Sequence, residues 1–428
     1  MKNLLLLTMI CFALGLTGCK PQSARQNPAG HAAAQSDAEL QQVLTQLSGE
    51  FERISPRVIR PAEGFLKYPY LIPAGFYQQM WDWDGYFMGT WFIEKGQPEY
   101  MKYWALNFLE GMNENGYVAG CMTTEGPRVK RGTFFMKPFL SQGVLRASEA
   151  MGDFEWVRPW YDRLCRVLAY RDSTQRDEAT GLYFWEMAFQ SGADNNPALN
   201  YFADDTRSFL ACDCSTMQML EFQAQAKIAA ALGMAEDAAA YEARAQALAD
   251  AIRDILWCPI NQCFYNVDRE TCAHYHRISY SCFWPLYAGL ASQEDGRAMI
   301  RRYLLDETHL RSPHGLRSLS ASDPDYNNRN IILPFSNWQG PIWIPALVVY
   351  AGGMLNYGFR DELRPIALAT ARLLLADLEA YDTMHENYHA ETGVGLAPAP
   401  DYVDPDTGRF IGFISWNLCA ESVLRACQ

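Results

Sequence analysis

Residues 361–381 read DELRPIALATARLLLADLEAY, and this stretch decides the fold class. Its apolar side chains recur at three- and four-residue spacing, which places them on one face of an α-helix. Gly358 just before the stretch is a helix breaker that separates it from the preceding segment. The stretch is therefore predicted to form an amphipathic helix that packs on other helices. The apolar face consists of Leu363, Ile366, Ala367, Ala371, Leu374 and Leu378.

The same spacing continues outward from this helix through most of the chain. Helices are also predicted over 99–112, 134–151, 157–172, 214–232, 235–257, 280–290, 293–305, 342–357 and from 414 to the C-terminus. Roughly eleven helices result, with little strand-like alternation. No fixed sequence period repeats, which disfavours a stacked solenoid. We therefore predict an all-α fold, a closed double ring of helix hairpins whose loops at one end converge on a central cavity.

The N-terminus predicts export. Lys2 precedes an apolar run over 4–16, which is too short to span a membrane and fits a cleaved signal. The run leads into LTGC, ending at Cys19, which resembles the bacterial lipobox. Residues 1–18 are therefore predicted to be a lipoprotein signal peptide and Cys19 the lipidated residue; a plain secretory signal is the alternative. Lys20 is not the aspartate of inner-membrane lipoproteins, which favours the periplasmic side of the outer membrane or the cell surface.

Composition indicates how the mature chain is organised and which partners and metal sites it disfavours. Residues 19–36, rich in small and polar types, are predicted to be a lipidated flexible tether, and 37–428 a single domain. The net charge (36 − 49 = −13) argues against nucleic acid as a partner. The predicted membrane partner is the bilayer that holds the N-terminal lipid anchor. The cysteines lack the spacing of a structural zinc site. Buried free thiols are predicted, with a local bridge between Cys258 and Cys263 as the alternative.

Residues 79–87 read QMWDWDGYF. If the backbone alternates, Trp81 and Trp83 lie on one side and the carboxylates of Asp82 and Asp84 on the other. Flat rings stack on the C–H face of a pyranose, and carboxylates accept hydrogen bonds from neighbouring hydroxyls. The pattern therefore favours a sugar site. The alternative is the start of a helix with aspartate caps and core tryptophans.

Two further segments read as loops. In SGADNNP, 191–197, Ser-Gly before the aspartate and Pro after it predict a turn with Asp194 at its tip. In NWQGPIW, 337–343, the Gly-Pro pair predicts a helix start flanked by tryptophans. Arg317, shortly before this loop, either holds a carboxylate in the pocket or caps a helix.

Residues 385–393 read HENYHAETG. His385, Glu386 and His389 match H-E-x-x-H, the pattern of zinc hydrolases. That chemistry needs a helix, so that both histidines share a face, and a third ligand downstream. The segment instead runs into a turn-rich stretch that no histidine follows. A zinc hydrolase is therefore the third alternative, and no metal is predicted.

Taken together, these segments resemble glycoside hydrolase family 63, which is related to the trehalases. The resemblance runs from Gln79 to Trp416 and rests on six motifs in the family's order. They are Trp83-Asp84, Gly96-Gln97-Pro98-Glu99 with Met112-Asn113-Glu114-Asn115-Gly116-Tyr117, Ser191-Gly192 with Asp194-Asn195, Arg317-Ser318-Leu319-Ser320 with Asp323-Pro324, Trp338 with Gly340-Pro341-Ile342-Trp343, and His385-Glu386-Asn387-Tyr388 with Thr392-Gly393 and Ser415-Trp416.

The resemblance implies an (α/α)6 toroid and an inverting mechanism. Asp194 would then be the general acid and Glu386 the general base, with their carboxyl groups about 6.5–9.5 Å apart to admit a water. The chain departs from the family at three positions: Gln190 replaces a frequent Glu, Gln339 a frequent Arg, and Ala198 a frequent basic residue. These departures bear on which sugar the pocket holds and leave both carboxylates intact.

The sequence thus predicts an exported, lipid-anchored, inverting glycosidase that removes terminal α-linked glucose, or mannose, from small glycosides or oligosaccharides. Its predicted partner is a carbohydrate substrate, and no cofactor is expected. The alternative is a non-catalytic surface glycan-binding lipoprotein built on a glycosidase-like toroid. The residues predicted to contact the sugar are Gln79, Trp81, Trp83, Asp84, Arg317, Trp338, Gln339, Trp343, His385, Tyr388 and Trp416.

Overall fold

A computed structural model describes residues 28–75, 77–128, 135–199, 206–330, 336–398 and 402–428. The chain divides into two compact units, Met1–Glu39 and Leu40–Gln428, and the architecture below is that of the second. The α-helices are α1 (Pro28–Ile54), α2 (Asp82–Glu94), α3 (Glu99–Glu110), α4 (Leu140–Met151), α5 (Tyr161–Gln175), α6 (Cys212–Ala231), α7 (Ala235–Ala251), α8 (Trp284–Tyr287), α9 (Gln293–Met299), α10 (Ile344–Asn356), α11 (Arg360–Tyr381) and α12 (Cys419–Ala426).

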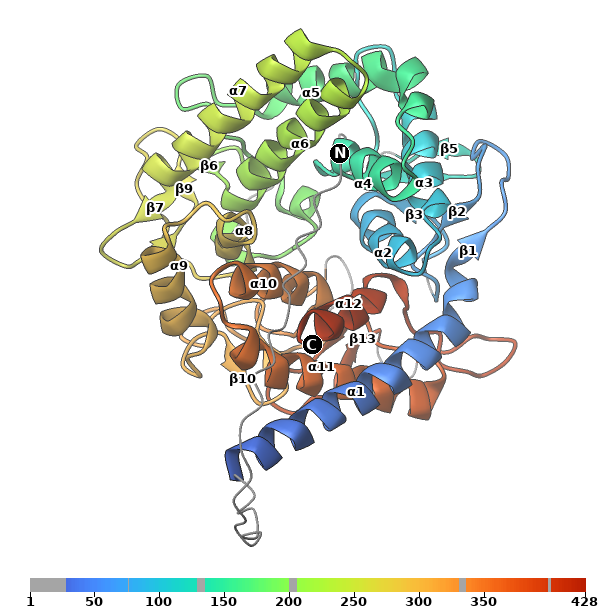
Figure 1. The fold of residues 1–428 in the computed structure, drawn as a ribbon, viewed down its shortest axis with the longest axis vertical. Helices are drawn as coiled ribbons and strands as arrows, with labels where there is room; N and C mark the ends of the chain where they lie inside the picture. The colour runs from blue at the N-terminus through green and yellow to red at the C-terminus, as the bar shows by residue number, and fades with distance from the viewer. Residues whose placement is uncertain (1–27, 76, 129–134, 200–205, 331–335, 399–401) are drawn as a thin grey trace, which may run out of the picture. The chain divides into compact units, whose positions relative to one another are not determined.

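Six helices form a closed inner ring. Each of α2, α4, α6, α8, α10 and α12 packs on the next, and α12 packs back on α2 (Figure 1). The intervening helices lie outside this ring: α3 packs on α2 and α4, α7 on α6, and α11 on α10 and α12. This alternation of inner and outer helices is the predicted (α/α)6 toroid, which is confirmed.

The sequence of each helix fits its layer. Inner helix α6 is buried along most of its length, because it meets the ring on one side and outer helices on the other. Outer helix α7 buries only Ala245, Leu248 and Ala249 and exposes much of the rest of its surface. Outer helix α11 buries the predicted apolar face of 361–381, including Leu363 and Leu374. Apolar periodicity thus marks the outer layer, and nearly continuous burial marks the inner one.

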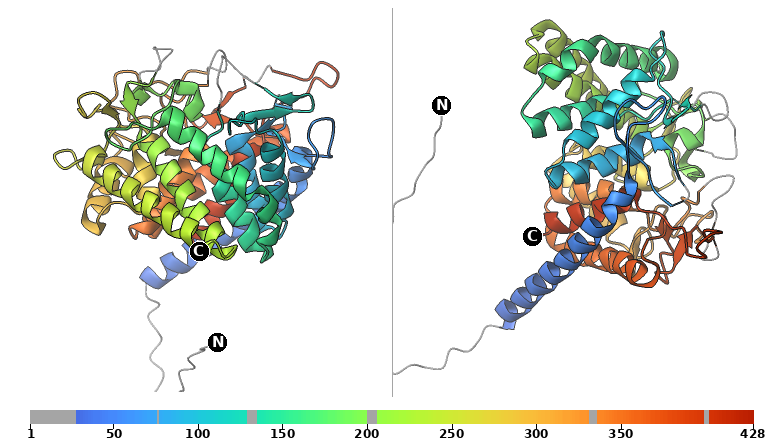
Figure 2. Two further views of the ribbon diagram at one scale, coloured as in Figure 1. Left: turned by 90° about the horizontal axis from the view of Figure 1, so that it is seen from above. Right: turned by 90° about the vertical axis from the view of Figure 1, so that its right-hand side faces the viewer.

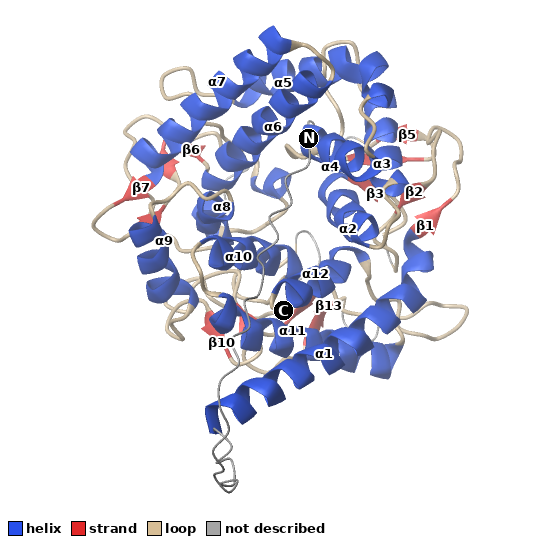
Figure 3. Cartoon of the chain, in the orientation of Figure 1, coloured by secondary structure: helices blue, strands red, loops and turns tan. Residues whose placement is uncertain are grey.

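The strands are short and hold neighbouring loop segments together (Figure 3). All pair antiparallel, and with the connecting loops they gather on one side of the ring (Figure 2, left). They are β1 (Ile59–Arg60), β2 (Tyr70–Leu71), β3 (Met80–Trp81), β4 (Cys121–Thr123), β5 (Gly126–Pro127), β6 (Phe209–Leu210), β7 (Trp257–Cys258), β8 (Cys263–Phe264), β9 (Val267–Asp268), β10 (Arg311–Ser312), β11 (Gly315–Leu316), β12 (Asn387–Tyr388) and β13 (Gly395–Ala397).

Helix boundaries differ from the predicted ones where proline or tight turns intervene. The segment predicted over 134–151 becomes α4 only from Leu140, just after Pro138. The segment over 157–172 starts as a 3-10 turn, Glu155–Trp160, with Pro159 inside it. α7 and α9 each end in a π-helical turn, Ile252–Leu256 and Ile300–Leu304.

At the N-terminus, α1 begins at Pro28, inside the stretch predicted as a tether. The predicted signal peptide and Cys19 lie outside the described residues. Within the described ranges, no helix is both long and apolar enough to cross a membrane. The ten cysteines described there are free thiols; eight are buried as predicted, whereas Cys165 is half-buried and Cys272 exposed. Cys258 faces Cys263 across β7 and β8 without a bridge.

Candidate active site

The starts of two inner helices carry carboxylates, among them the predicted site residue Asp84. Asp82 and Asp84 lie in the first turn of α2, and Asp213 in the first turn of α6. The free N–H groups and dipole of a helix N-terminus favour negative charge. The toroid therefore gathers carboxylates at one end of its inner ring.

Asp194 lies on a turn between two 3-10 helices, Ala188–Ser191 and Pro197–Leu199, as predicted. Gly192 adopts a φ of +84°, where a residue without Cβ is favoured. An added Cβ there would lie 2.5 Å from the Trp83 ring. The turn that carries Asp194 therefore rests directly on Trp83.

A second loop fixes this turn from the other side. The Ser336 N–H donates to Asp194 Oδ2 at 3.1 Å. Asn195 Oδ1 accepts from the Trp338 N–H at 2.5 Å, and Gln339 Nε2 donates to the Asn195 carbonyl at 3.3 Å. Gln339 therefore holds the turn that carries Asp194, which favours a supporting role over the predicted contact with sugar.

Glu386 lies on a bend that directly precedes β12 and is 3% exposed. Its N–H donates to the Ala397 carbonyl at 2.6 Å, and the Tyr77 hydroxyl approaches its Oε1 at 3.5 Å. Glu386 Oε2 is buried without a hydrogen bond inside the described ranges. This oxygen is the free acceptor that a general base needs.

Three carboxylates act on one another here. Burial, followed by the charges of Asp84 and Asp194, raises the pKa of Glu386 well above its ordinary value. Burial likewise raises the pKa of Asp84 to about 7, although the Ser415 hydroxyl donates to it at 2.7 Å. The cluster therefore retains protons near neutral pH. A general base acts only in its ionised form, so Glu386 is expected to serve as one above its raised pKa.

Asp377 of α11 holds the segment that carries Glu386. Its Oδ2 accepts from the His385 N–H at 2.8 Å and the Tyr388 hydroxyl at 2.6 Å, and contacts His385 Nδ1 at 2.7 Å. His385 and Tyr388 are both bonded to Asp377, and they therefore hold the backbone on either side of Glu386 in place. These contacts favour a supporting role for both residues over the predicted contact with sugar.

Aromatic rings form the wall beside the carboxylates. Trp338 stacks on Trp343 at 4.2 Å and lies 5.7 Å from Trp83, whose ring is 5.5 Å from Trp416. The buried indole Nε1 donors of Trp338 and Trp416 have no hydrogen-bond partner inside the described ranges. Trp343 donates to the Asn337 carbonyl and supports Trp338. Trp81 is half-buried, edge-on to Tyr77 at 6.0 Å, with half-buried Gln79 between them in the chain.

The alternating arrangement predicted for 81–84 is wrong. The chain turns into α2 at Asp82, so the two carboxylates diverge by helical rotation. Asp82 pairs with buried Lys137 at 3.2 Å, and that ammonium lies 4.9 Å above the Trp83 ring. Asp84 points instead to Ser415. The helix start of the alternative is confirmed and Trp83 is buried, but the N-cap is half-buried Trp81 and no aspartate side chain of the described residues caps the helix. Asp84 still joins the carboxylate cluster.

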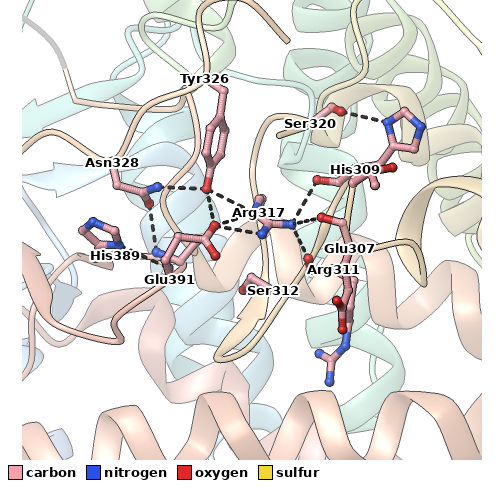
Figure 4. Close-up of polar contacts among 12 residues, drawn as sticks. Glu307, His309, Arg311, Ser312, Arg317, Ser320, Tyr326, Asn328, His389 and Glu391 are labelled. Carbon is pink, nitrogen blue, oxygen red and sulfur yellow. Dashed lines mark hydrogen bonds and ion pairs between the residues drawn. The ribbon is translucent and has the colours of Figure 1, made fainter. Parts of the chain in front are cut away.

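Arg317 also departs from its prediction. Its guanidinium binds Glu391 at 2.8 Å and also contacts the Tyr326 hydroxyl and the backbone carbonyls of 307, 309 and 311 (Figure 4). Arg317 does hold a carboxylate, but the carboxylate belongs to the protein. Its donors are occupied in joining two loops, which corrects the prediction that it contacts the substrate.

The segment 385–389 is not helical. It passes through bends into β12, so His385 and His389 cannot share a helix face as a zinc-hydrolase site requires. His385 Nδ1 is engaged by Asp377, and His389 Nδ1 accepts from the Glu391 N–H. The zinc-hydrolase alternative is therefore contradicted by the backbone.

Sequence reasoning missed Tyr77, Lys137, Asn195 and Asp377 as functional residues. Tyr77 is close enough for the charges of Glu386, Asp194 and Asp84 all to raise its pKa, after burial. Asn195 is part of the Asp194-Asn195 motif, so its position was a usable signal, whereas no motif adjoins Lys137. Asp377 had no such signal, because it reads as one polar position on an amphipathic helix.

A family model described as the mannosylglycerate hydrolase MGH1-like glycoside hydrolase domain matches residues 77–409. The chain is 28% identical over 173 residues to a mannosylglycerate hydrolase of Rubrobacter radiotolerans, covering 40% of this chain and 36% of that protein. It is 20% identical over 348 residues to a periplasmic trehalase of Shigella flexneri, covering 70% and 59% respectively. The matches thus span about a third to three-fifths of these relatives' lengths.

The fold has solved counterparts. The crystal structure of a family 63 mannosylglycerate hydrolase from Thermus thermophilus, in complex with glucose, aligns with a TM-score of 0.66 at 16% identity. The alignment covers 89% of this chain and 99% of that one. At this identity the likeness establishes the shared toroid.

Proposed function

Because the chain belongs to the MGH1-like glycoside hydrolases, within glycoside hydrolase family 63, we propose that it is an inverting α-glycosidase with Asp194 as general acid and Glu386 as general base. The observation that carries this proposal is the carboxylate cluster. Asp84, Asp194 and Glu386 come from segments far apart in the chain and interact electrostatically beside an aromatic wall. Such a constellation can donate one proton and accept another.

In the proposed reaction, the Asp194 carboxyl donates its proton to the glycosidic oxygen as the bond from the anomeric carbon breaks. Glu386 removes a proton from a water that attacks the same carbon from the opposite face. Oxygen from water replaces the leaving oxygen, so the configuration inverts. The anomeric carbon and ring oxygen share the developing positive charge, which a carboxylate such as Asp84 stabilises.

We further propose a small α-glucoside or α-mannoside as substrate, with glycosylglycerates among the candidates. The names of the relatives support this class, since they include mannosylglycerate hydrolase and trehalase. The indole donors of Trp338 and Trp416 and the side chain of Asp84 offer hydrogen bonds to the hydroxyls of one terminal sugar.

Proton NMR of hydrolysis tests this proposal. The purified protein is incubated with a panel of α-glucosides, α-mannosides and glycosylglycerates, and the first anomer released is recorded. Initial release of the β-anomer from an α-linked substrate is the expected result. Initial release of the α-anomer would refute the acid and base assignment. Sugar binding by calorimetry without turnover of any substrate would instead support the non-catalytic glycan-binding alternative.

Export and lipid anchoring form a separate proposal. The signal-like N-terminus and the lipobox-like LTGC support cleavage before Cys19 and its lipidation, with the enzyme held at the periplasmic side of the outer membrane or the cell surface. Mass spectrometry of the protein from membranes should find a diacylglyceryl-modified Cys19. A Cys19→Ala variant that stays in the membrane fraction with an unchanged mass pattern would contradict this proposal.

A further inference from the structure

A cavity lies outside the carboxylate cluster, behind the segment that carries Glu386. Its volume is about 450 Å³. It opens where the turn after α1, the C-terminal end of α11 and the segment 409–414 meet. We call this cavity the arginine pocket. The lining residues that matter most to its chemistry are Arg57, Arg60, Tyr381, Thr383, Arg409 and Phe410.

The side chains that line the arginine pocket carry more positive than negative charge. Asp382 is its one carboxylate, and it is shared by Arg57, at 2.5 Å, and by Arg53, at 2.6 Å. Arg60 donates to the carbonyls of Arg57 and Ile59, each at 2.9 Å, and has no carboxylate partner inside the described ranges. The pocket is thus lined by three arginines, Arg57, Arg60 and Arg409, and by one carboxylate that is already paired, in a protein whose net charge is −13.

Arg409 contributes a guanidinium whose side chain can change conformation. Its side chain is exposed, and within the described ranges it makes no hydrogen bond or ion pair. By contrast Arg60 is held by backbone carbonyls, which fixes its guanidinium in advance. A fixed guanidinium and a mobile one can close on an anion from two sides, each offering paired N–H donors.

Apolar rings line the rest of the arginine pocket. Tyr381 and Phe410 lie 5.1 Å apart, and Phe410 packs 4.6 Å from His385 on the side toward Glu386. Arg60 reaches Gln78, the neighbour of Tyr77, at 3.4 Å. The pocket therefore adjoins the segments that carry Glu386 and Tyr77.

From this geometry we propose that the arginine pocket binds a compact organic anion, a carboxylate or a phosphate monoester. The anionic group is held between Arg60 and Arg409, and the carbon skeleton lies against Tyr381 and Phe410. The anion comes either from a distal acidic group of the glycoside substrate or from a free small molecule. Both sources present the same chemistry to the pocket.

Titration calorimetry of the full chain in detergent, at 50 mM salt, tests the proposal with inorganic phosphate and citrate as probes and glycerol as the neutral control. Saturable binding of at least one anion is expected, with glycerol silent. The double variant Arg60→Gln/Arg409→Ala should weaken that binding at least tenfold. Arg158→Ala, which alters an exposed arginine paired with Glu155, should leave it unchanged.

No saturable binding of either anion up to about 10 mM, a concentration at which a paired-arginine site should be filled, would overturn the proposal. Equal binding by the double variant would overturn it as well. The readout does not depend on hydrolysis, so its failure is distinct from failure of the proposed glycosidase function. With an active substrate, competitive inhibition by the bound anion would identify the substrate's acidic group as the occupant. Unchanged hydrolysis would identify a free anion.

Discussion

The Gly192→Ala substitution tests whether the acid-bearing turn depends on its contact with Trp83. Gly192 has a φ of +84°, and an alanine in the left-handed region costs about 1–2 kcal/mol. The new Cβ would also lie 2.5 Å from Trp83 and 2.8 Å from the Lys137 Cε. Trp83 is only 5% exposed and packed by other rings, so it cannot turn away. Overpacking of this kind adds about 1–3 kcal/mol.

Gly233→Ala is the matched control. Gly233 has a similar φ of +79°, and nothing lies within 4 Å of its added Cβ. This variant should lose only the backbone contribution of about 1–2 kcal/mol and keep full activity. Gly192→Ala should lose about 2–5 kcal/mol in total. If the turn relieves the contact by moving about 1 Å, turnover should fall about a hundredfold.

The two variants are compared with wild type by urea unfolding, followed by tryptophan fluorescence, and by kcat on a cleaved glycoside. A Gly192→Ala enzyme that keeps wild-type kcat and loses no more stability than Gly233→Ala would refute the reasoning. Loss of activity with the stability of the control would mean that the turn moves freely, with little strain to relieve.

Three further predictions concern the carboxylates. Asp194→Asn and Glu386→Gln should each abolish nearly all hydrolysis while sugar binding by calorimetry persists; retained hydrolysis in either variant would remove that residue from its role. Asp84 has a folded pKa of about 7 against an ordinary 3.8, so its protonation stabilises the native state at low pH and that stability is lost as pH rises through 7. Wild type should therefore lose about 2–3 kcal/mol relative to Asp84→Asn between pH 5 and 8 in urea unfolding, and parallel curves would contradict this. Asp377→Asn should lower kcat about tenfold or more with KM little changed and should move the acidic limb of the kcat–pH profile, because it loosens the segment that carries Glu386; a wild-type pH profile would make Asp377 merely structural.

Local sequence patterns predicted the helices well and their ends less well. The face of 361–381 is buried in α11 as expected, because spacing alone decides which side chains share a helix face. Ends shifted where proline or a tight turn changed the backbone, as at Leu140 after Pro138. Asp194 was correctly placed on a turn, because the glycine and proline around it act on the adjacent backbone.

Partners across the fold were harder to predict. From the sequence, Arg317 was expected to hold a carboxylate in the pocket or to cap a helix, yet the carboxylate that it binds is that of Glu391, 74 residues later. Trp83 looked like a sugar platform, yet it supports Gly192 and lies under Lys137. Asp377 gave no sign of its contacts to His385.

The sequence by itself therefore determined the class of fold, the turn that carries Asp194 and the identity of both candidate catalytic carboxylates. Each depends on side chains a few positions apart or on a recognisable motif. Only the tertiary structure decided which groups surround Glu386 and which polar atoms are left for a ligand. Those properties depend on burial and on charges brought together by closing the ring, and neither is encoded in the spacing of any one segment.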